Sequence, residues 1–365
     1  MPHWPCPPVL TQTIRFLRSH DGVRLAYSAS GQGPAVVKAA TWLSHLEYDW
    51  ESPVWRHVLQ AFSGRHQLLR YDERGCGLSD WDVDDLGFDS WVGDLEAVVD
   101  TAGLARFALL GVSQGASIAI AYAVRHPERV SHLVLQGGYA RGRLVRSNTP
   151  QQAEEAEMMC RLAELGWGRA DPSFRQFFTT QFIPGGTPDQ HAWFNELERV
   201  STSPANAARF MRAFDRIDVT ALLPQVRCPT LVLHSRDDVR VPFEEGRLLA
   251  MQIPGATLVP VDSRNHLLLA DEPGWAHAWQ AIEQFLPATA ATVQDGPLAR
   301  LTPRLRELLE LVAQGRDNMQ IAAVMGLSEK TVRNQVSILF DRLGVESRAM
   351  AVVVARENGL GQHRR

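Results

Sequence analysis

The amino-acid sequence predicts an α/β domain built on a mostly parallel sheet, followed by a small all-α domain. Short apolar runs rich in β-branched residues alternate with longer helical patterns over about 290 residues. Beyond a polar segment without periodicity, the pattern is wholly helical. A chain of 365 residues also exceeds what one hydrophobic core usually organises, which favours two domains.

Eight short apolar runs predict the strands of the sheet. The first two flank His20-Asp21-Gly22 and predict a hairpin, whereas the others alternate with the helical crossovers that parallel strands require. The expected strands are residues 14–18, 23–28, 35–39, 67–71, 107–112, 130–136, 230–234 and 257–261. The clearest expected helices are residues 90–102, 113–126, 243–252 and 275–285.

Two segments interrupt this alternation. Residues from about 141 to 219 contain helix-favouring stretches separated by Pro and Gly, without a convincing strand, which predicts an inserted helical cap. Residues 287–297, PATAATVQDGP, are small and polar without periodicity, which predicts a linker. We therefore expect one domain over residues 1–290, a linker over 291–298 and a second domain over 299–365.

Composition and charge exclude several classes of protein. Hydrophobic residues make up 45% and charged residues 21% of the chain, which argues against disorder and collagen-like repeats. No apolar run has the length of a membrane span, and the first ten residues lack a signal-peptide pattern, so we expect a cytoplasmic location and no membrane partner. The net charge of −4 conceals an asymmetry, because residues 297–365 hold 11 basic and 7 acidic residues. A basic tail on an acidic body is typical of a segment that binds polyanions.

The four cysteines indicate neither a metal site nor a disulfide framework. Cys6, Cys76, Cys160 and Cys228 lack the close pairing that zinc sites or a redox C-x-x-C motif need. We expect reduced thiols, no bound metal and no other cofactor.

The strongest catalytic pattern is GVSQG at residues 111–115. It follows the apolar run FALLGV and precedes the helical run ASIAIAYAVRH, which is the strand-turn-helix setting of a nucleophile elbow. Gly111 and Gly115 allow the strand and the helix to approach closely, and the helix N-terminus offers backbone N–H groups to an oxyanion. Ser113 is therefore the candidate nucleophile.

A nucleophilic serine needs a base that an acid holds, and both candidates follow in the order Asp, His. Asp238 lies in a polar turn after an expected strand, with Asp237 as the alternative acid. His266 lies in the loop after the last expected strand. Each residue alone is equally compatible with a structural role, but together they predict a Ser113–Asp238–His266 triad.

These motifs resemble the α/β-hydrolase superfamily over about residues 12–286. Besides GVSQG, the run YDERGCGLSD at residues 71–80 is similar to the family's turn after its fourth strand, and HPERV at 126–130 is similar to its entry into the next strand. The resemblance implies that Ser113 is the nucleophile, Asp238 the acid, His266 the base and the Gln114 backbone N–H one oxyanion donor.

The sequence departs from the pattern of that family around the expected oxyanion hole. Ala39-Ala40 replaces the usual His-Gly after the third strand, which leaves Thr41 in the second donor position and predicts a reshaped hole. Asn265 precedes the histidine where the family usually has Gly. Lys38, at the end of the same strand, is expected to line the ligand pocket or to be a snorkelling strand-end lysine.

The terminal segment predicts three consecutive helices and a fourth at its end. Thr302 and Pro303 suit the N-cap and first position of a helix, and Asp317 with Gln320 predicts a capping box for the next. Ser328 is expected to cap the third helix.

The spacing between the second and third of these helices is that of a helix-turn-helix. Ala322 lets the two helices cross closely, Gly326 permits a left-handed turn, and Val332 fills the wedge between them. The outer face of the third helix is expected to carry no apolar residue. Arg333, Asn334 and Ser337 would face base edges in the major groove, with Lys330 and Thr331 nearer phosphate.

Residues 301 to about 352 resemble the LuxR-type helix-turn-helix family nearly without gaps. LTPRLRELLELVAQG, NMQIAAVMGLSEKTVRNQV and LGVESRAMAV are similar to its three blocks, and the departures at Leu305 and Gln335 leave the apolar frame intact. The resemblance implies a homodimer on double-stranded DNA, with the last helix, residues 348–357, as a dimer contact.

Together, the two domains predict a transcription regulator whose hydrolase-like domain senses a small acyl ligand and either only binds it or also hydrolyses it. One alternative is a working esterase or lactonase with the DNA-binding tail as an accessory module. Another is an inactive hydrolase fold that serves as an interaction platform. Ester, lactone, amide and carbon–carbon substrates all remain open.

Overall fold

The computed structural model describes residues 11–147, 149–286, 303–343, 345, 347–357 and 360. Contacts within the chain divide it into two compact units, residues 1–290 and 291–365, and each unit has its own hydrophobic core. The linker expected at 291–298 and the expected N-cap Thr302 lie outside the described residues. Among the residues that are described, no helix has the length and apolar content needed to cross a lipid bilayer.

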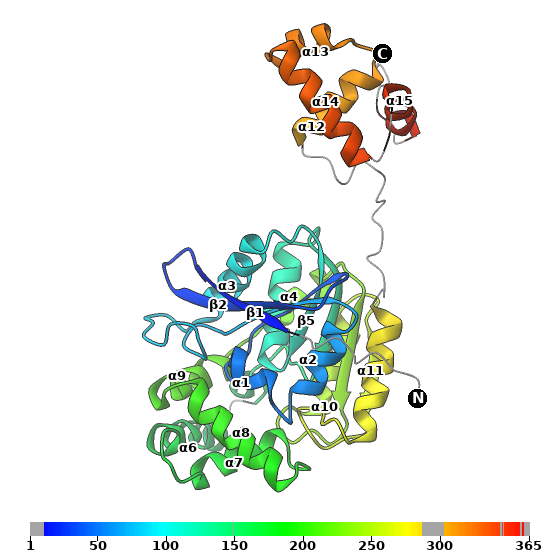
Figure 1. The fold of residues 1–365 in the computed structure, drawn as a ribbon. Coiled ribbons are helices and arrows are strands. Elements are labelled where there is room, and N and C mark those ends of the chain that lie inside the picture. The colour runs from blue at the N-terminus through cyan, green and yellow to red at the C-terminus, as the bar shows by residue number, and fades with distance from the viewer. Residues whose placement is uncertain are drawn as a thin grey trace, which may run out of the picture. The chain divides into compact units, whose positions relative to one another are not determined.

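The described strands of the first unit form one eight-stranded sheet in the order β1-β2-β4-β3-β5-β6-β7-β8 (Figure 1). β2 pairs antiparallel with β1 and β4, whereas all other neighbours are parallel. The strands are β1 (Gln12–Arg18), β2 (Arg24–Ser30), β3 (Ala35–Lys38), β4 (Gln67–Tyr71), β5 (Phe107–Val112), β6 (Val130–Gln136), β7 (Thr230–Ser235) and β8 (Thr257–Val261). The prediction of a mostly parallel eight-stranded sheet is confirmed.

Six helices of the described chain pack directly on this sheet or on its loops. They are α1 (Leu46–Trp50), α2 (Arg56–Ser63), α3 (Phe88–Thr101), α4 (Gln114–Arg125), α10 (Phe243–Gln252) and α11 (Pro273–Phe285). The four helices expected from the sequence correspond to α3, α4, α10 and α11. Helices α1 and α2 were not predicted, although Val58, Leu59 and Phe62 of α2 recur at helical spacing and are all buried.

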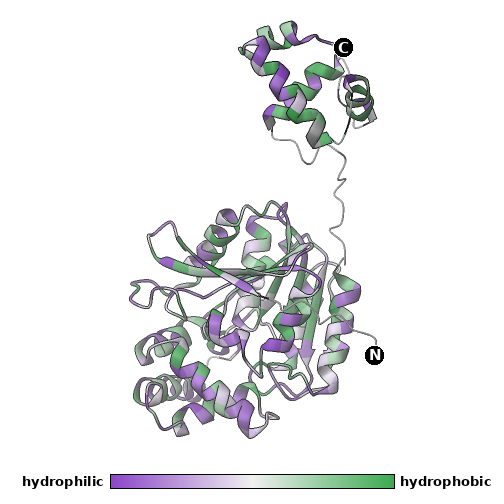
Figure 2. Cartoon of the chain, viewed as in Figure 1, coloured by the Kyte–Doolittle hydropathy of each residue, from purple (hydrophilic) through white to green (hydrophobic). Residues whose placement is uncertain are grey.

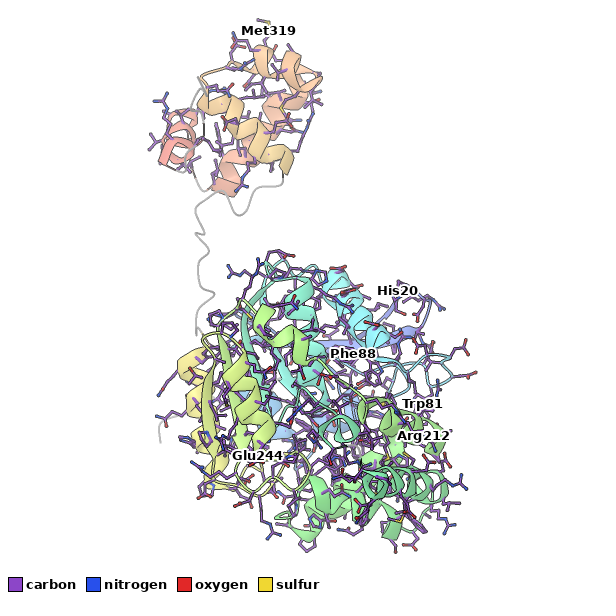
Figure 3. The ribbon with its side chains drawn as sticks, turned by 180° about the vertical axis from the view of Figure 1, so that it is seen from behind. His20, Trp81, Phe88, Arg212, Glu244 and Met319 are labelled. Atoms are coloured by element: carbon purple, nitrogen blue, oxygen red, sulfur yellow. The ribbon has the colours of Figure 1, made fainter. Side chains whose placement is uncertain are left out.

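Five helices lie between β6 and β7, and those that Figure 1 labels gather at one end of the first unit. They are α5 (Arg143–Arg146), α6 (Pro150–Gly166), α7 (Ser173–Phe182), α8 (Pro188–Ser201) and α9 (Pro204–Phe214), and the 3-10 helix η1 (Thr220–Gln225) follows them. An isolated antiparallel bridge joins Arg141 to Asp218, so the first and last residues of this cap lie side by side. Arg212, labelled in Figure 3, ties α9 to α6 through ion pairs with Glu157 and Glu164.

Burial along the strands follows from their place in the sheet. Every residue of β5 and of β7 is buried, as expected for parallel strands that are covered on both faces. Figure 2 shows hydrophobic residues along the strands in the interior of the sheet and hydrophilic residues toward the outside of the helices. Ten residues of α4 are buried, so the helix that follows Ser113 runs through the interior. The elements on either side of Ser113 are therefore rigidly packed.

The second unit is a small helical domain with four helices among its described residues. They are α12 (Pro303–Ala313), α13 (Asn318–Met325), α14 (Glu329–Leu343) and α15 (Arg348–Glu357). The side chain of Asp317 accepts from the Gln320 N–H, and the Gln320 side chain accepts from the Asp317 N–H, which is the expected capping box. The Ser328 hydroxyl accepts from the Thr331 N–H at 3.2 Å and caps α14 as expected.

Gly326 ends α13 in the left-handed conformation, with φ +65° and ψ +36°, and a Cβ placed there would meet no atom within 4 Å. We expect Gly326→Ala to lower the free energy of unfolding of this unit by about 1 kcal/mol, because only the backbone strain remains. Gly326→Asn should lose less, since Asn tolerates this conformation. Urea unfolding of the two variants measures both values, and equal losses would show that a side-chain contact dominates.

Candidate active site and DNA-binding surface

Ser113 lies in the turn between β5 and α4, where the sequence places the nucleophile elbow. Its φ is +53° and its ψ is −123°, and no other non-glycine residue in the described part of the chain has a positive φ. The backbone N–H of Ser113 donates to the Gln136 carbonyl at 3.0 Å, and α4 begins at the next residue. A strained backbone of this kind concentrates at functional sites, because it projects one side chain out of the packed elements on both sides.

Two glycines beside Ser113 leave room for close backbone contacts. A Cβ at Gly111 would lie 2.5 Å from the Cα of Ala116, and a Cβ at Gly115 would lie 2.9 Å from the carbonyl oxygen of Ala40. Neither separation is compatible with a side chain. The loop after β3 is therefore in direct contact with the N-terminus of α4, as a second oxyanion donor from that loop requires.

The two other predicted triad residues are hydrogen-bonded to each other. His266 Nδ1 lies 2.7 Å from Asp238 Oδ2, and both side chains are buried. Asp238 Oδ1 accepts from the backbone N–H groups of Arg240 and Val241 at 2.8 and 2.9 Å. Burial raises the pKa of Asp238, but the charge and hydrogen bond of His266 and the Val241 N–H outweigh it, so the net pKa is lowered. Asp238 therefore stays ionised and fixes the orientation of the imidazole.

The cap holds the loop that carries His266. The backbone N–H groups of His266 and Leu267 both donate to the carbonyl of Phe182, at 2.9 and 3.2 Å, and Phe182 is the last residue of α7. The side chain of Asn265 accepts from the Gly185 N–H at 2.7 Å, which gives this residue a role that the family's usual glycine cannot have. The position of the candidate base thus depends on the cap.

Two cavities meet at Ser113, and both are also lined by Trp42. The arginine cavity encloses about 410 Å³ of empty space, part of it open to solvent; its lining includes Tyr139, Arg143, Arg146, Asp215 and Arg240. The apolar cavity encloses about 340 Å³; its lining includes Trp55, Phe182, Phe194, His266 and Leu267. His266 Nε2 is buried without a hydrogen-bond partner, so the ring nitrogen that would accept the Ser113 proton is free.

Sequence reasoning missed the three arginines of the arginine cavity. Arg143 and Arg146 belong to α5, and Arg240 follows Asp238 by two residues. The proximity of Arg240 to the candidate acid was a usable signal. Nothing in the sequence pattern placed the cap residues Arg143 and Arg146 beside Ser113.

The predicted oxyanion donors come from two different segments, the first turn of α4 and the loop after β3. Gln114 is the first residue of α4, so its backbone N–H has no intrahelical acceptor. Thr41 lines the apolar cavity next to Ser113. The side chain of Gln114 accepts from the Trp42 N–H at 3.2 Å and donates to Glu73 Oε1 at 2.9 Å. Gln114 thereby fixes the loop that replaces the usual His-Gly segment.

The turn after β4 stabilises the position of Gln114. Arg74 is fully buried and forms a bidentate ion pair with Asp94, at 2.7 and 2.6 Å, and a further ion pair with Asp21 at 2.7 Å. Asp72 Oδ2 accepts from the N–H groups of Leu46 and Leu78. The charged residues of the YDERGCGLSD run therefore hold the turn together, and the carboxyl of Glu73 reaches Gln114.

Lys38 does not line the arginine cavity or the apolar cavity, so its expected contact with a ligand stays a prediction. Its ammonium lies 5.1 Å from the centroid of the Trp55 ring, and it is Trp55 that lines the apolar cavity. Burial lowers the pKa of Lys38 to about 8, while the nearby Asp49 carboxylate opposes that shift. The side chain of Lys38 is buried, so it does not snorkel to solvent.

The predicted DNA contacts share one exposed side of α14. Lys330, Thr331, Arg333, Asn334 and Ser337 are all exposed, while Val332, Val336 and Leu339 are buried against the other helices. One expectation was wrong, since the apolar Ile338 is 48% exposed. Ile338 follows Asn334 by one helical turn and shares its face, which the neighbouring helices leave uncovered.

Comparison with known families agrees with this geometry. The family model for the alpha/beta hydrolase fold matches residues 47–273, more than half of the chain. The chain belongs to the α/β-hydrolase family. The model for bacterial regulatory proteins of the luxR family matches residues 299–355, so the chain also contains a C-terminal LuxR-type helix-turn-helix domain.

Individual relatives of the hydrolase part are distant. The putative carbamate hydrolase RutD of Klebsiella pneumoniae is 28% identical over 218 residues, which are 58% of this chain and 79% of that protein. The pimeloyl-(acyl-carrier protein) methyl ester esterase of Nitrosomonas europaea is 29% identical over 63% of this chain and 87% of its own. The crystal structure of a hydrolase from Pseudomonas aeruginosa PA01 superposes with a TM-score of 0.61 at 23% identity, over 74% of this chain and 97% of that one, which supports the fold.

Burial raises the pKa of Glu73 to about 8 from an ordinary value of 4.5. The folded protein therefore holds a proton that the unfolded chain releases, so the stability this group contributes is full below pH 4.5 and is lost as the pH rises toward 8. Glu73→Gln removes this dependence and keeps an acceptor for Gln114. We expect the variant to gain stability relative to wild type between about pH 5 and pH 8.

Urea unfolding of the hydrolase unit at several pH values measures that difference. Glu244→Gln is the matched control, because Glu244 lies exposed at the start of α10 (Figure 3). A difference between Glu73→Gln and wild type that stays constant with pH would contradict the assignment of a protonated Glu73.

Proposed function

We propose that this protein is a cytoplasmic transcription regulator whose hydrolase domain binds, and hydrolyses, a small acyl compound. The observation that carries the proposal is the Asp238–His266 hydrogen bond of 2.7 Å, at a cavity shared with the strained Ser113, in one chain with a LuxR-type domain. Related proteins named as hydrolases of carbamate and methyl ester bonds favour an acyl compound as ligand. The location follows from the DNA partner.

In the proposed reaction, Ser113 Oγ attacks the acyl carbonyl carbon while His266 Nε2 accepts the hydroxyl proton. The backbone N–H groups of Gln114 and Thr41 stabilise the oxyanion of the tetrahedral intermediate. Collapse of that intermediate breaks the bond to the leaving group, which takes the proton from His266. Water then attacks the acyl-serine, again with His266 as base, and releases the acid and free Ser113. Asp238 stabilises the imidazolium in both steps.

The second unit acts as a homodimer on double-stranded DNA, with α14 in the major groove. Arg333, Asn334 and Ser337 read base edges, and Lys330 and Thr331 contact phosphate. The helix α15 supplies the dimer contact, since Met350 and Val353 lie three residues apart on it and are 50% and 55% exposed. Occupancy of the hydrolase domain sets whether two such units pair on DNA.

A second candidate function is a working esterase or lactonase whose tail only locates the enzyme. The dependence of the His266 loop on the cap is compatible with either function. The two differ in one observable, because only the regulator changes its DNA affinity when the hydrolase domain is occupied.

A fluorophosphonate probe tests the nucleophile, because it forms a covalent bond only with an activated serine. We expect wild type to be labelled and to hydrolyse simple acyl esters, and Ser113→Ala to do neither. Ser117→Ala is the matched control, since Ser117 lies buried on α4 and donates to the Tyr139 carbonyl. Absence of both labelling and hydrolysis in wild type would contradict the enzymatic part of the proposal.

Loss of one base contact tests the DNA surface. We expect Arg333→Ala to weaken binding to the DNA upstream of the protein's own gene by roughly 1 to 3 kcal/mol and to relax its specificity. Lys330→Ala should weaken binding to all sequences alike and lower the salt dependence. Arg306, exposed on α12, provides the arginine control. Fluorescence anisotropy measures the affinities, and an unchanged value for Arg333→Ala would refute its role.

A further inference from the structure

The arginine cavity carries more positive charge than its own carboxylate can balance. Three guanidinium groups line it, those of Arg143, Arg146 and Arg240, against the single carboxylate of Asp215. Ser113 and Gln114 line the same cavity, so this charge lies beside the candidate nucleophile. Buried or half-buried charges cost free energy unless they are paired, so the partner of each guanidinium decides what the cavity is for.

Arg143 is the only one of the three with an ion pair in the described structure. Its Nη2 lies 2.8 Å from Asp215 Oδ2, which ties α5 to the end of α9. The Nε of Arg143 is buried and has no hydrogen-bond partner. The Asp215 carboxylate is thus paired with Arg143, and the Nε–H of Arg143 remains available to a further acceptor.

Arg240 has no carboxylate partner within 4.0 Å among the described residues. Its side chain donates one hydrogen bond, from Nη1 to the neutral Gln181 Oε1 at 3.0 Å. The guanidinium lies 5.3 Å from the ring centroid of Phe182 and 5.5 Å from that of Phe214. The aromatic rings orient the cation without neutralising it.

Arg146 also lacks a carboxylate partner. Its Nη1 donates to the carbonyl of Arg141 at 3.0 Å, and its guanidinium lies 5.9 Å from the ring centroid of Tyr139. It has no ion pair within the described part of the chain. Burial lowers the pKa of both Arg146 and Arg240, which reflects how poorly the protein itself compensates these charges.

Arginines with a structural role in this protein look different. Arg74 places its donors on two carboxylates, and Arg175 donates to the carbonyls of Asn195, Trp167 and Arg169 at 2.7, 2.8 and 2.5 Å. Both use several of their donors inside the protein. Arg146 and Arg240 each use one, so their remaining donors are available to a molecule in the cavity.

We propose that the arginine cavity binds a carboxylate of the substrate, so that the hydrolysed compound is an acyl derivative with a second, anionic end. This inference rests on the proposed function, because it names the substrate class of the same site. Guanidinium groups suit this partner, since their planar array of donors matches the two oxygens of a carboxylate. An anion there offsets the excess charge of Arg146 and Arg240.

The second cavity fixes the orientation of the substrate. His266 lines the apolar cavity and not the arginine cavity, and it is the group that gives its proton to the leaving group. The leaving group therefore lies among Trp55, Phe194 and Leu267. The acyl chain extends from Ser113 in the other direction, and its carboxylate end reaches Arg146 and Arg240.

A pair of esters of equal length tests this substrate class. Mono-4-nitrophenyl adipate carries a carboxylate at the end of its acyl chain, and 4-nitrophenyl hexanoate carries a methyl group there. With the full-length protein, we expect kcat/KM to be about tenfold higher for the adipate ester, the factor that one charged hydrogen bond provides. Arg240→Met and Arg146→Met should each reduce the ratio of the two values about tenfold.

Arg236→Met is the matched control. Arg236 is exposed on the same loop as Arg240, and its guanidinium also lies over an aromatic ring, 5.8 Å from the centroid of Phe243, but it does not line the cavity. We expect its ratio of kcat/KM values to equal that of wild type. An equal fall in all three variants would overturn the assignment, because it would reflect a general loss of positive charge.

Binding by Ser113→Ala separates this inference from the proposed function. Isothermal titration of that variant with monomethyl adipate needs no hydrolysis, and we expect binding that Arg240→Met in the same background weakens about tenfold. If wild type hydrolyses 4-nitrophenyl hexanoate as well as mono-4-nitrophenyl adipate, the carboxylate assignment is overturned, whereas the proposed hydrolysis stands. Inorganic phosphate that binds more tightly than monomethyl adipate also overturns it. Wild type without any hydrolysis contradicts the proposed function alone, and the titration still decides the anion site.

Discussion

The contact between the loop after β3 and the N-terminus of α4 is the constraint on which the rest of the candidate site depends. There is no space for a Cβ at Gly111 or Gly115, so strand, helix and loop approach to backbone distance. This approach brings the Gln114 side chain within reach of the Trp42 N–H, directly after Ser113 with its positive φ. The strain at Ser113 persists because buried elements on both sides determine it.

The parts of the fold that are determined by neighbouring residues could be predicted from the sequence. Strands β5 and β7 are built around the apolar runs FALLGV and LVL because both faces of the sheet are covered, and such runs are visible without coordinates. The capping box of Asp317 and Gln320 and the left-handed Gly326 also arise within a few residues. Ser113, Asp238 and His266 could be named because their order and their places after strands are fixed by the fold.

The cavity lining could not be predicted, because it is assembled from segments far apart in the chain. Lys38 has the chemistry of a ligand contact, yet the Trp55 ring lines the cavity in its place. Arg143 and Arg146 carry no motif, and their position depends on how the cap returns at Asp218. Helices α1 and α2 were missed because they are short and lie in a segment whose most visible features are its aromatic residues.

Phe182 couples the position of the cap to that of the candidate triad. Its carbonyl accepts the N–H groups of His266 and Leu267, and its ring lies against Arg240, whose own N–H holds Asp238. A displacement of α7 therefore disturbs the candidate base His266, the candidate acid Asp238 and the arginine cavity at the same time. Equilibrium linkage makes this relation reciprocal. A ligand that neutralises Arg240 would stabilise the cap in its present position, and a displacement of the cap would lower the affinity for that ligand. The end of one cap helix thus links the position of the cap to the charge balance of the arginine cavity within the first unit.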